Sequence, residues 1–164
     1  MSIAKYIAAG LAAVAAAYLA FRARVAEVPA VTAAPTSGPG APAIRKLLAQ
    51  VNATWPGRSK ASDGIMGDAA HQARASDHNT GDAIDITLDS ANGPDLDALA
   101  EALLGDPRTK YVIWNKRIRS RTVEPGKWRP YAGSNPHTKH LHLSIDAANR
   151  SDDRAWNIGS PRIA

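Results

Sequence analysis

Apolar residues recur at helical spacing in two segments of the chain. The first segment covers residues 44–53 and ends before Trp55-Pro56-Gly57, with apolar positions at Ile44, Leu47, Leu48 and Val51. The second begins at Pro94-Asp95 and ends at Gly105-Asp106-Pro107, with apolar positions at Leu96, Leu99, Ala100, Leu103 and Leu104. We therefore predict two amphipathic helices, each buried along one face.

Three shorter segments show the patterns of strands. Apolar and polar positions alternate through residues 83–88, with Ile84, Ile86 and Leu88 set against Asp85 and Thr87. Residues 111–114 and 141–145 are apolar runs of strand length, and the basic, turn-rich segment 115–134 between them favours a hairpin. Together with the two helices, these segments predict an α+β fold in which a small antiparallel sheet is flanked by helices.

The first 24 residues form a separate unit. Residues 6–21 carry no charge, are rich in alanine and lie between Lys5 and Arg22. Their length is near the lower limit of about 17 residues for a membrane-spanning helix. We interpret residues 1–24 as an uncleaved signal anchor, because no clear cleavage site follows the apolar run. A cleaved signal peptide and a soluble Ala-rich helix are the alternatives.

The rest of the chain divides into a linker, a globular domain and a tail. Residues 25–42 are rich in Pro, Gly and Ala and are typical of a spacer that buries no core. The globular domain therefore covers residues 43–150. Residues 151–164 form a polar C-terminal tail, in which Trp156 is a candidate anchor.

Composition restricts the chemistry that this chain can perform. The chain has no cysteine, so a disulfide framework, a thiolate metal site and a cysteine nucleophile are excluded, and any metal must be held by His and carboxylate. The net charge of +5 and the pI near 9.7 favour anionic surroundings such as nucleic acid, anionic lipid or acidic cell-wall polymers. No specific nucleic-acid partner is expected, because the basic residues are not interleaved with aromatic ones.

Three of the five histidines lie within six consecutive residues, at His137, His140 and His142. His140 and His142 are two residues apart at the start of the strand predicted for residues 141–145. Their side chains therefore lie on the same face of the sheet. Imidazoles side by side on one face favour a metal or proton-transfer site over core packing.

A second polar stretch offers partners for these histidines. His78 lies in a predicted loop, Gly81 permits a tight turn, and Asp85 follows in an apolar strand where a buried carboxylate needs a partner. Each residue also has a purely structural alternative. Asp85 would accept a hydrogen bond from the backbone or an Arg, and His78 would cap a turn. Together, His78, Asp85 and His142 would provide two imidazoles and one carboxylate and leave a fourth position open, as in catalytic zinc sites. His137 and His140 would then be supporting or catalytic groups.

The pattern Ser76-x-His78-x-x-Gly81-x-Ala83-x-Asp85, followed by His140-x-His142, resembles the zinc peptidase group that includes D-Ala-D-Ala carboxypeptidases, lysostaphin-type endopeptidases and the hedgehog domain. The resemblance covers residues 44–146 and is strongest to the carboxypeptidase branch and its phage endolysin relatives. It implies one zinc ion held by His78, Asp85 and His142, and cleavage of peptide bonds in peptidoglycan. The domain at residues 43–150 would then be a zinc peptidase domain with its zinc site on the sheet.

The chain departs from the carboxypeptidase pattern at one position. Lys139 stands where carboxypeptidases of this group carry a catalytic Glu, three residues before the last histidine ligand. The pattern His137-x-x-His140-x-His142 is similar to that of murein endopeptidases, which implies that His140 is the base and that His137 assists it. By the same resemblance, Arg74, four residues before His78, corresponds to the Arg that binds the substrate carboxylate in the carboxypeptidases. The alternative is that Arg74 is a surface residue without contact to substrate.

The resulting functional prediction is a zinc metallopeptidase that cleaves stem peptides or cross-links of peptidoglycan. Its partners would be peptidoglycan and, through residues 1–24, a membrane. It would be anchored or exported, with its catalytic domain in the periplasm or cell-wall space. Two alternatives remain open: a catalytically inactive wall-binding or structural module on the same fold, kept open by Lys139, and a metal-dependent nuclease, weakly supported by the +5 charge.

Overall fold

A computed structural model gives the fold of the 164-residue chain. It describes residues 39–159, apart from the side chains of Ala70 and His71. The predicted signal anchor at residues 1–24, and the predicted linker up to residue 38, lie outside the described residues. Within residues 39–159, every helix is too short or too polar to cross a membrane.

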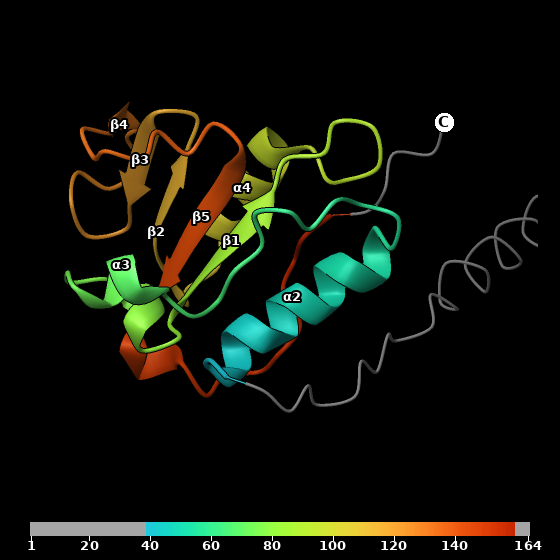
Figure 1. The fold of residues 1–164 in the computed structure, drawn as a ribbon, viewed down its shortest axis with the longest axis horizontal. Coiled ribbons are helices and arrows are strands. Elements are labelled where there is room, and N and C mark those ends of the chain that lie inside the picture. The colour runs from blue at the N-terminus through green and yellow to red at the C-terminus, as the bar shows by residue number, and fades with distance from the viewer. Residues whose placement is uncertain (1–38, 160–164) are drawn as a thin grey trace, which may run out of the picture. The chain divides into compact units, whose positions relative to one another are not determined.

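The centre of the fold is a five-stranded antiparallel sheet with the strand order β1-β5-β2-β3-β4. Its strands are β1 (Ala83–Thr87), β2 (Thr109–Trp114), β3 (Arg117–Ser120), β4 (Arg129–Pro130) and β5 (His140–Ile145). In Figure 1, helix α2 (Pro42–Thr54) runs alongside the β1 edge, and helix α4 (Leu96–Leu104) lies behind the sheet. The predicted α+β fold, a small antiparallel sheet with two flanking helices, is confirmed.

Both helices begin where local chemistry favours a helix start. Pro42 occupies the first turn of α2, where its missing N–H leaves no donor unsatisfied. The Asp95 carboxylate caps α4 by accepting from the backbone N–H groups of Asp97 and Ala98. The apolar stripes of the two helices meet the sheet in one core, whose fully buried members include Ile44, Leu47, Leu99, Leu103, Ile84, Ile86, Leu141 and Leu143.

The two faces of the sheet differ in polarity because side chains alternate along each strand. Ile84 and Ile86 pair with Leu143 and Leu141 and face the helices. On the opposite face, Asp85 pairs with His142, Thr87 with His140, and Ala83 with Ser144. The predicted alternation of residues 83–88 is confirmed for β1. It fails at Leu88, which follows the strand and is 38% exposed.

Short elements fill the segments that were predicted to be irregular. A four-residue helix, α3 (Ala69–Gln72), and a 3-10 turn, η1 (Asp77–Asn79), precede β1, and a second 3-10 turn, η2 (Ala147–Asn149), follows β5. The hairpin predicted within residues 115–134 is present as the antiparallel strands β3 and β4. A second hairpin joins β2 to β3 through Asn115 and Lys116. Both residues have positive φ, at 49° and 63°, as a two-residue type I′ turn requires.

The described part of the C-terminal tail, residues 151–159, packs on the domain. The buried Arg108 guanidinium donates to the carbonyls of Asp152 and Arg154 at 2.9 and 2.7 Å. It also lies 3.7 Å from the centre of the Trp156 ring. The Trp156 indole N–H donates to the carbonyl of Ala43 at 2.9 Å, and this bond links the tail to the start of α2.

Candidate metal centre

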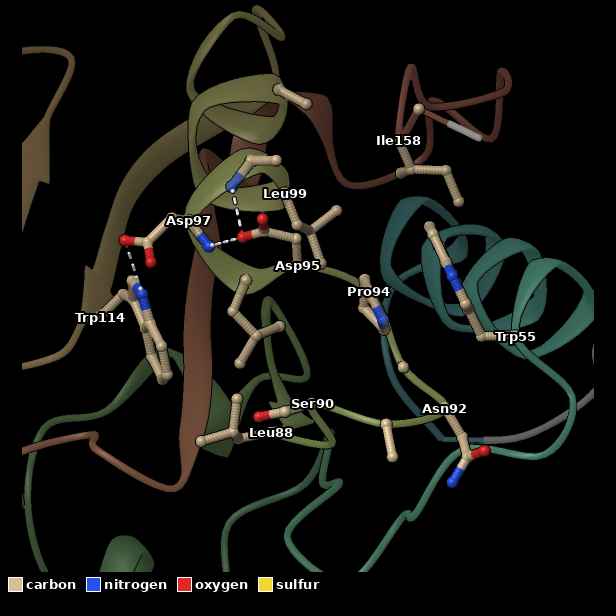
Figure 2. A pocket seen from close by; sticks show the side chains of 16 residues that line it. Trp55, Leu88, Ser90, Asn92, Pro94, Asp95, Asp97, Leu99, Trp114 and Ile158 are labelled. Atoms are coloured by element: carbon tan, nitrogen blue, oxygen red, sulfur yellow. Dashed lines mark hydrogen bonds between the residues drawn. The ribbon is translucent and has the colours of Figure 1, made fainter. Parts of the chain in front are cut away.

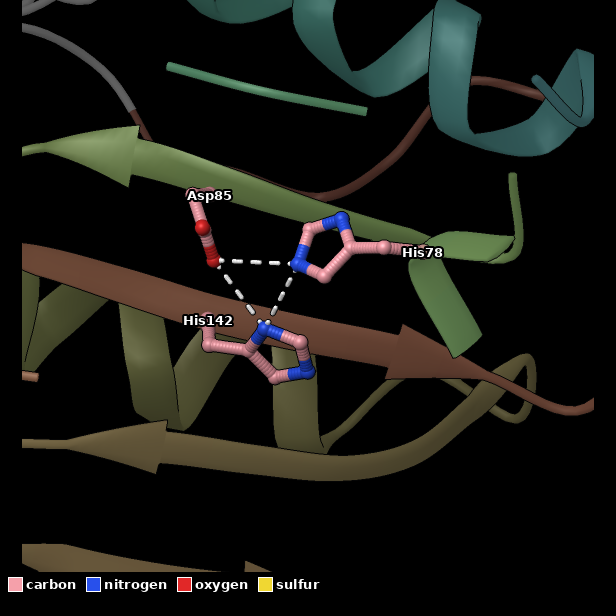
Figure 3. A group of neighbouring side chains, drawn as sticks. All are labelled: His78, Asp85 and His142. Carbon is pink, nitrogen blue, oxygen red and sulfur yellow. Dashed lines mark hydrogen bonds and ion pairs between the residues drawn. The ribbon is translucent and has the colours of Figure 1, made fainter. Parts of the chain in front are cut away.

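Three side chains converge on the polar face of the sheet, as Figure 3 shows. His142 Nδ1 lies 3.0 Å from Asp85 Oδ1 and 3.1 Å from His78 Nε2. His78 Nε2 lies 3.4 Å from the same carboxylate oxygen. These are the three residues that the sequence predicted as metal ligands, and they form a group that could hold a metal ion.

Strand register and a tight turn bring the three residues together. Asp85 in β1 and His142 in β5 are direct cross-strand partners, so pairing of the sheet alone places them side by side. His78 comes from η1, whose first turn is capped by the Ser76 hydroxyl accepting from the His78 N–H. Ser76 therefore supports the turn that carries His78.

Gly81 allows the chain to turn from η1 into β1. Its φ is +74°, which side-chain-bearing residues adopt only at a cost. A Cβ at this position would also lie 2.4 Å from the Cα of Gly40. Gly81 is therefore required both by the backbone conformation and by close packing.

A hydrogen bond behind His78 fixes which of its ring nitrogens carries a proton, whereas the group behind His142 is a hydroxyl, which can donate or accept. His78 Nδ1 lies 2.8 Å from the Ile65 carbonyl, which can only accept, so Nδ1 carries the hydrogen and Nε2 keeps its lone pair. His142 Nε2 lies 3.0 Å from the Ser144 hydroxyl, which leaves Nδ1 to face the site. His78 Nε2 is therefore an acceptor when its imidazole is neutral, and His142 Nδ1 is an acceptor in the tautomer whose Nε2–H donates to the Ser144 hydroxyl.

In this tautomer of His142, the centre of the group contains three acceptor atoms and no donor. A carboxylate and two imidazole lone pairs at this separation repel one another unless a cation lies between them. That cation is either a metal ion or the proton of a charged imidazole. In a tetrahedral zinc site with metal–ligand bonds of about 2.0–2.1 Å, two ligand atoms lie about 3.3 Å apart. The three separations of 3.0–3.4 Å in this group match that distance.

The charges of Asp85, His78 and His142 are set by their burial and by their contacts with one another. Burial opposes ionisation of Asp85, but hydrogen bonds and charge from His142 and His78 outweigh it and hold the pKa of the carboxyl well below its usual range. Burial also opposes the charged form of His78, yet its contact with Asp85 raises the pKa of that imidazole. Deeper burial lowers the pKa of His142. The carboxylate is therefore ionised and His142 is neutral, as metal ligation requires.

The two remaining cluster histidines lie beside this group. His140 Nε2 lies 3.7 Å from the second Asp85 oxygen, Oδ2. That nitrogen is buried and has no hydrogen-bond partner among the described residues. The ring of His137 is centred 4.9 Å from that of His140 and 5.5 Å from that of His142. The structure therefore brings all four predicted histidines and Asp85 into one cluster.

His137 is held in an unusual conformation. Its φ is +50°, and its Nδ1 donates to the carbonyl of Asn135 at 2.7 Å, so Nε2 bears the lone pair. Backbone N–H groups of the Asn115-Lys116 turn donate to the carbonyls of His137 and Pro136, each at 2.9 Å. Burial and the neighbouring imidazoles of His142 and His140 lower the pKa of His137 to about 4. His137 is therefore a neutral acceptor near pH 7.

Arg74 lies on the loop between α3 and η1 and is exposed. Its backbone carbonyl accepts a hydrogen bond from the Asn79 amide at 2.9 Å, which ties this loop to the His78 turn. The predicted contact of its guanidinium with substrate is not tested by these contacts and stays a prediction.

Sequence reasoning missed a supporting layer of residues behind His142. Ser144 is fully buried two residues after His142, and its hydroxyl lies 3.0 Å from His142 Nε2. Tyr111 in β2 stacks on His142 with 5.6 Å between ring centres and an interplanar angle of 18°. Burial raises the pKa of Tyr111 to about 12, so its hydroxyl stays protonated. The i+2 spacing of Ser144 from His142 was the available signal, because it places both on one face.

A separate hollow of about 610 Å³ lies elsewhere on the domain. Figure 2 shows Trp55 and Trp114 on opposite sides of it, with Pro94 and Asp95 of the chain leading into α4 between them. Its lining contains none of the histidines or Asp85. The metal-binding group therefore belongs to the opposite, polar face of the sheet and not to this cavity.

Comparison with known proteins gives one match. The family model described as "VldE, C-terminal domain" matches residues 36–142. No curated protein and no solved structure matches the chain. The matched region contains His78, Asp85, His137 and His140, and it ends at His142.

Proposed function

The chain belongs to the family of the VldE C-terminal domain, and we propose from the site itself that it is a zinc-dependent peptidase that hydrolyses peptide bonds in peptidoglycan. One observation carries the proposal. Two imidazole nitrogens and a carboxylate oxygen converge at 3.0–3.4 Å beside two further imidazoles. The substrate class comes from the sequence resemblance to cell-wall zinc peptidases.

The donor set fits zinc better than a hard cation. His78, Asp85 and His142 offer two imidazole nitrogens and one carboxylate oxygen, whereas Mg²⁺ and Ca²⁺ prefer oxygen ligands throughout. Three protein donors would leave one tetrahedral position for water or substrate. When bound, zinc supplies Lewis-acid chemistry: it polarises a carbonyl and makes water a nucleophile near neutral pH.

The two other histidines would handle the proton. His140 Nε2 is buried without a hydrogen-bond partner among the described residues and faces Asp85, so it can accept the proton of the attacking water and return it to the leaving amine. His137 is neutral with its lone pair on Nε2, so it can accept a hydrogen bond from that water but cannot donate one. We therefore assign His140 as the general base and His137 as the residue that orients the water.

The remaining parts of the proposal rest on the sequence. The net charge of +5 favours an anionic polymer such as the cell wall. Residues 1–24 would anchor or export the domain, so that it reaches peptidoglycan in the periplasm or cell-wall space. Arg74 would contact the substrate carboxylate, and Lys139 in place of an acidic base favours endopeptidase action as much as carboxypeptidase action.

The proposal is tested by digestion of purified peptidoglycan with the full chain. Zinc-loaded protein should release fragments with new amino and carboxyl ends, which mass analysis identifies together with the bond cleaved. Chelator should stop the release, and added zinc should restore it. The matched control is Asp85→Asn, which keeps the size of the side chain but removes the ligand charge. Zinc-loaded protein that binds peptidoglycan without cutting it would favour the inactive wall-binding module instead.

A further inference from the structure

Asp85 lies between two pairs of histidines on the polar face of the sheet. One of its oxygens, Oδ1, contacts His78 and His142, the other residues of the metal-binding group described above. Its second oxygen, Oδ2, lies 3.7 Å from His140 Nε2. The His137 ring packs edge-on against that of His140, with 4.9 Å between the ring centres. The carboxylate therefore has a second oxygen that the first metal ion does not use.

Strand pairing explains why one carboxylate reaches both pairs of histidines. Asp85 is the direct cross-strand partner of His142, and His140 lies two residues before His142 on the same face of β5. Diagonal neighbours at this offset are still within reach of an aromatic side chain. The two oxygens of Asp85 therefore lie beside different histidines.

Asp85, His137 and His140 together offer a second set of metal ligands. One ligand atom from each lies within 4.8 Å of the other two. His137 Nδ1 donates to the Asn135 carbonyl, so its lone pair is on Nε2. His140 Nε2 is buried and has no hydrogen-bond partner among the described residues. Two imidazoles and a carboxylate are donors that zinc accepts.

We propose that Asp85, His137 and His140 form a second, weaker zinc site, which shares Asp85 with the first site and stops hydrolysis when it fills. Two-metal sites in enzymes place their ions about 3.5–4 Å apart, and a carboxylate with one oxygen toward each ion spans such a separation. The second ion would take the lone pair of His140. The effect on hydrolysis rests on the proposed function, in which His140 is the base, whereas the binding of a second ion does not.

The second site should be the weaker of the two for two reasons. His140 Nε2 and Asp85 Oδ2 are 3.7 Å apart, whereas the ligand atoms of the first group are 3.0–3.4 Å apart, so the second group must contract further around an ion. An ion in the first group also repels a second cation nearby. The first equivalent of zinc should therefore bind at least about tenfold more tightly than the second, a difference of about 1.4 kcal/mol.

Calorimetric titration of zinc into the metal-free, full-length chain tests the site without any hydrolysis. The unmodified chain should show two binding steps. His137→Gln and His140→Gln each remove one ligand of the second site, so both variants should carry the first equivalent at the first group and lose the second step. Asp85→Asn should weaken both steps, because Asp85 supplies a ligand to each site. Thermal unfolding of the metal-free proteins checks that every variant is folded.

Lys139→Gln is the matched control. Lys139 is exposed and lies next to His140 in the sequence, but its ammonium group has no lone pair to offer a metal ion. The Lys139→Gln protein should therefore keep both binding steps. Loss of the second step in this variant as well would show that the step reports the charge of the surface and not a set of ligands, which would overturn the site.

The hydrolysis rate gives a second readout of the same site. Release of new amino ends from purified peptidoglycan should rise up to one equivalent of zinc and fall again as the second binding step fills. In His137→Gln the rate should be lower from the start, but excess zinc should not reduce it further. A rate in the unmodified chain that stays constant while the second step fills would overturn the inhibitory role.

The second site is overturned if the unmodified chain binds one zinc ion only, or if the second step survives in both histidine variants. A second step that survives Asp85→Asn unchanged would overturn the sharing of the carboxylate. A chain that binds two zinc ions without cleaving peptidoglycan would overturn the proposed reaction and leave the second site standing. A chain that binds one zinc ion and cleaves peptidoglycan would do the reverse.

Discussion

His137 and His140 lie three residues apart, yet the atoms around their ring nitrogens differ. The neutral His137 donates its ring N–H to the Asn135 carbonyl. His140 Nε2, in contrast, is buried near Asp85 and has no hydrogen-bond partner in the described part of the chain. His140 Nε2 can therefore exchange a proton with a reacting water. The lowered pKa of His137 makes it a weak base, so it orients the water instead. The two histidines therefore have separate roles.

We predict that His140→Gln lowers kcat by about 10²–10⁴-fold, the usual range for loss of a general base. Zinc content should be unchanged, because His140 is not one of the three proposed ligands. His137→Gln should cost less, since it removes an orienting contact and leaves the base in place. Steady-state kinetics with a soluble peptidoglycan fragment, combined with metal analysis, separates the two effects. Normal turnover in His140→Gln would refute this assignment.

Gly81 gives a second prediction for a single residue. Gly81→Ala forces a Cβ into a backbone with φ +74° and against the Cα of Gly40 at 2.4 Å. The positive φ alone costs about 1–2 kcal/mol, and the contact with backbone adds to it. Urea unfolding should show the free energy of unfolding reduced by more than about 2 kcal/mol, with zinc affinity reduced because His78 moves.

Gly57→Ala is the control for this substitution. A Cβ at Gly57 would meet no atom within 4 Å, and its φ lies outside the positive range. Its stability and zinc affinity should match those of the unmodified chain. Equal behaviour of the two alanine variants would show that the turn before β1 tolerates a side chain.

Among the elements, the link between β1 and the segment before it depends on Asp63. The Asp63 carboxylate accepts from the fully buried Arg58 guanidinium at 2.9 Å. It also accepts from the Thr87 N–H and hydroxyl at 3.0 and 2.8 Å. These bonds attach the polar segment to the end of β1 and hold nearby Ile65, whose carbonyl fixes the His78 tautomer.

We predict that Asp63→Asn reduces the free energy of unfolding by about 3 kcal/mol at pH 7, because it leaves the buried Arg58 charge unpaired. Burial opposes ionisation of Asp63, but hydrogen bonds from Arg58 and Thr87 keep its pKa below the usual value of 3.8. A carboxyl with a lowered folded-state pKa stabilises the fold above its unfolded-state pKa. That contribution is lost as the pH falls through the folded-state pKa.

The difference between the two proteins should therefore be full at pH 7 and shrink at pH values below about 4. Urea unfolding at a series of pH values measures it, with exposed Asp153→Asn as the control. A difference that stays constant down to acidic pH would contradict the role given to the ionised carboxylate.

The helices and strands differ in how well the sequence predicts them. The two helices and strand β1 were predicted because each is long enough to show its period, and β2 and β5 were predicted because they are apolar runs of strand length. Helix α3 and strand β4 have four and two residues and no period of their own. Strand β4 is instead placed by pairing of Arg129 and Pro130 with β3, which depends on the tertiary fold.

The metal-binding group was predictable from local sequence, but its supporting contacts were not. The group of His78, Asp85 and His142 was expected from side-chain direction in strands and from the spacing of polar residues. Ser144 and Tyr111 were missed because a serine or a tyrosine contacts His142 only once folding brings the side chains together. The protonation of each imidazole likewise depends on contacts from distant residues such as Ile65.

For the whole molecule, the division of the sheet into two faces is the feature that gives the domain its chemistry. One face supports a single apolar core with α2, α4 and the buried Trp156 and Ile158 of the tail. The other face is left for charged and polar groups, which a hydrophobic core would exclude. Stability and metal binding therefore depend on different faces, and the zinc-ligand variants should remain folded.

A catalytic zinc ion held by His78, Asp85 and His142 is tested most directly by the hydrolysis rate as zinc is added to the metal-free, full-length chain. The rate of release of new amino ends from purified peptidoglycan should rise in proportion to zinc and level off at one equivalent. Asp85→Asn, confirmed as folded by thermal unfolding, should show no rise. Full activity in the metal-free chain, or an Asp85→Asn protein with a normal zinc response, would contradict the claim that these residues hold a catalytic zinc ion.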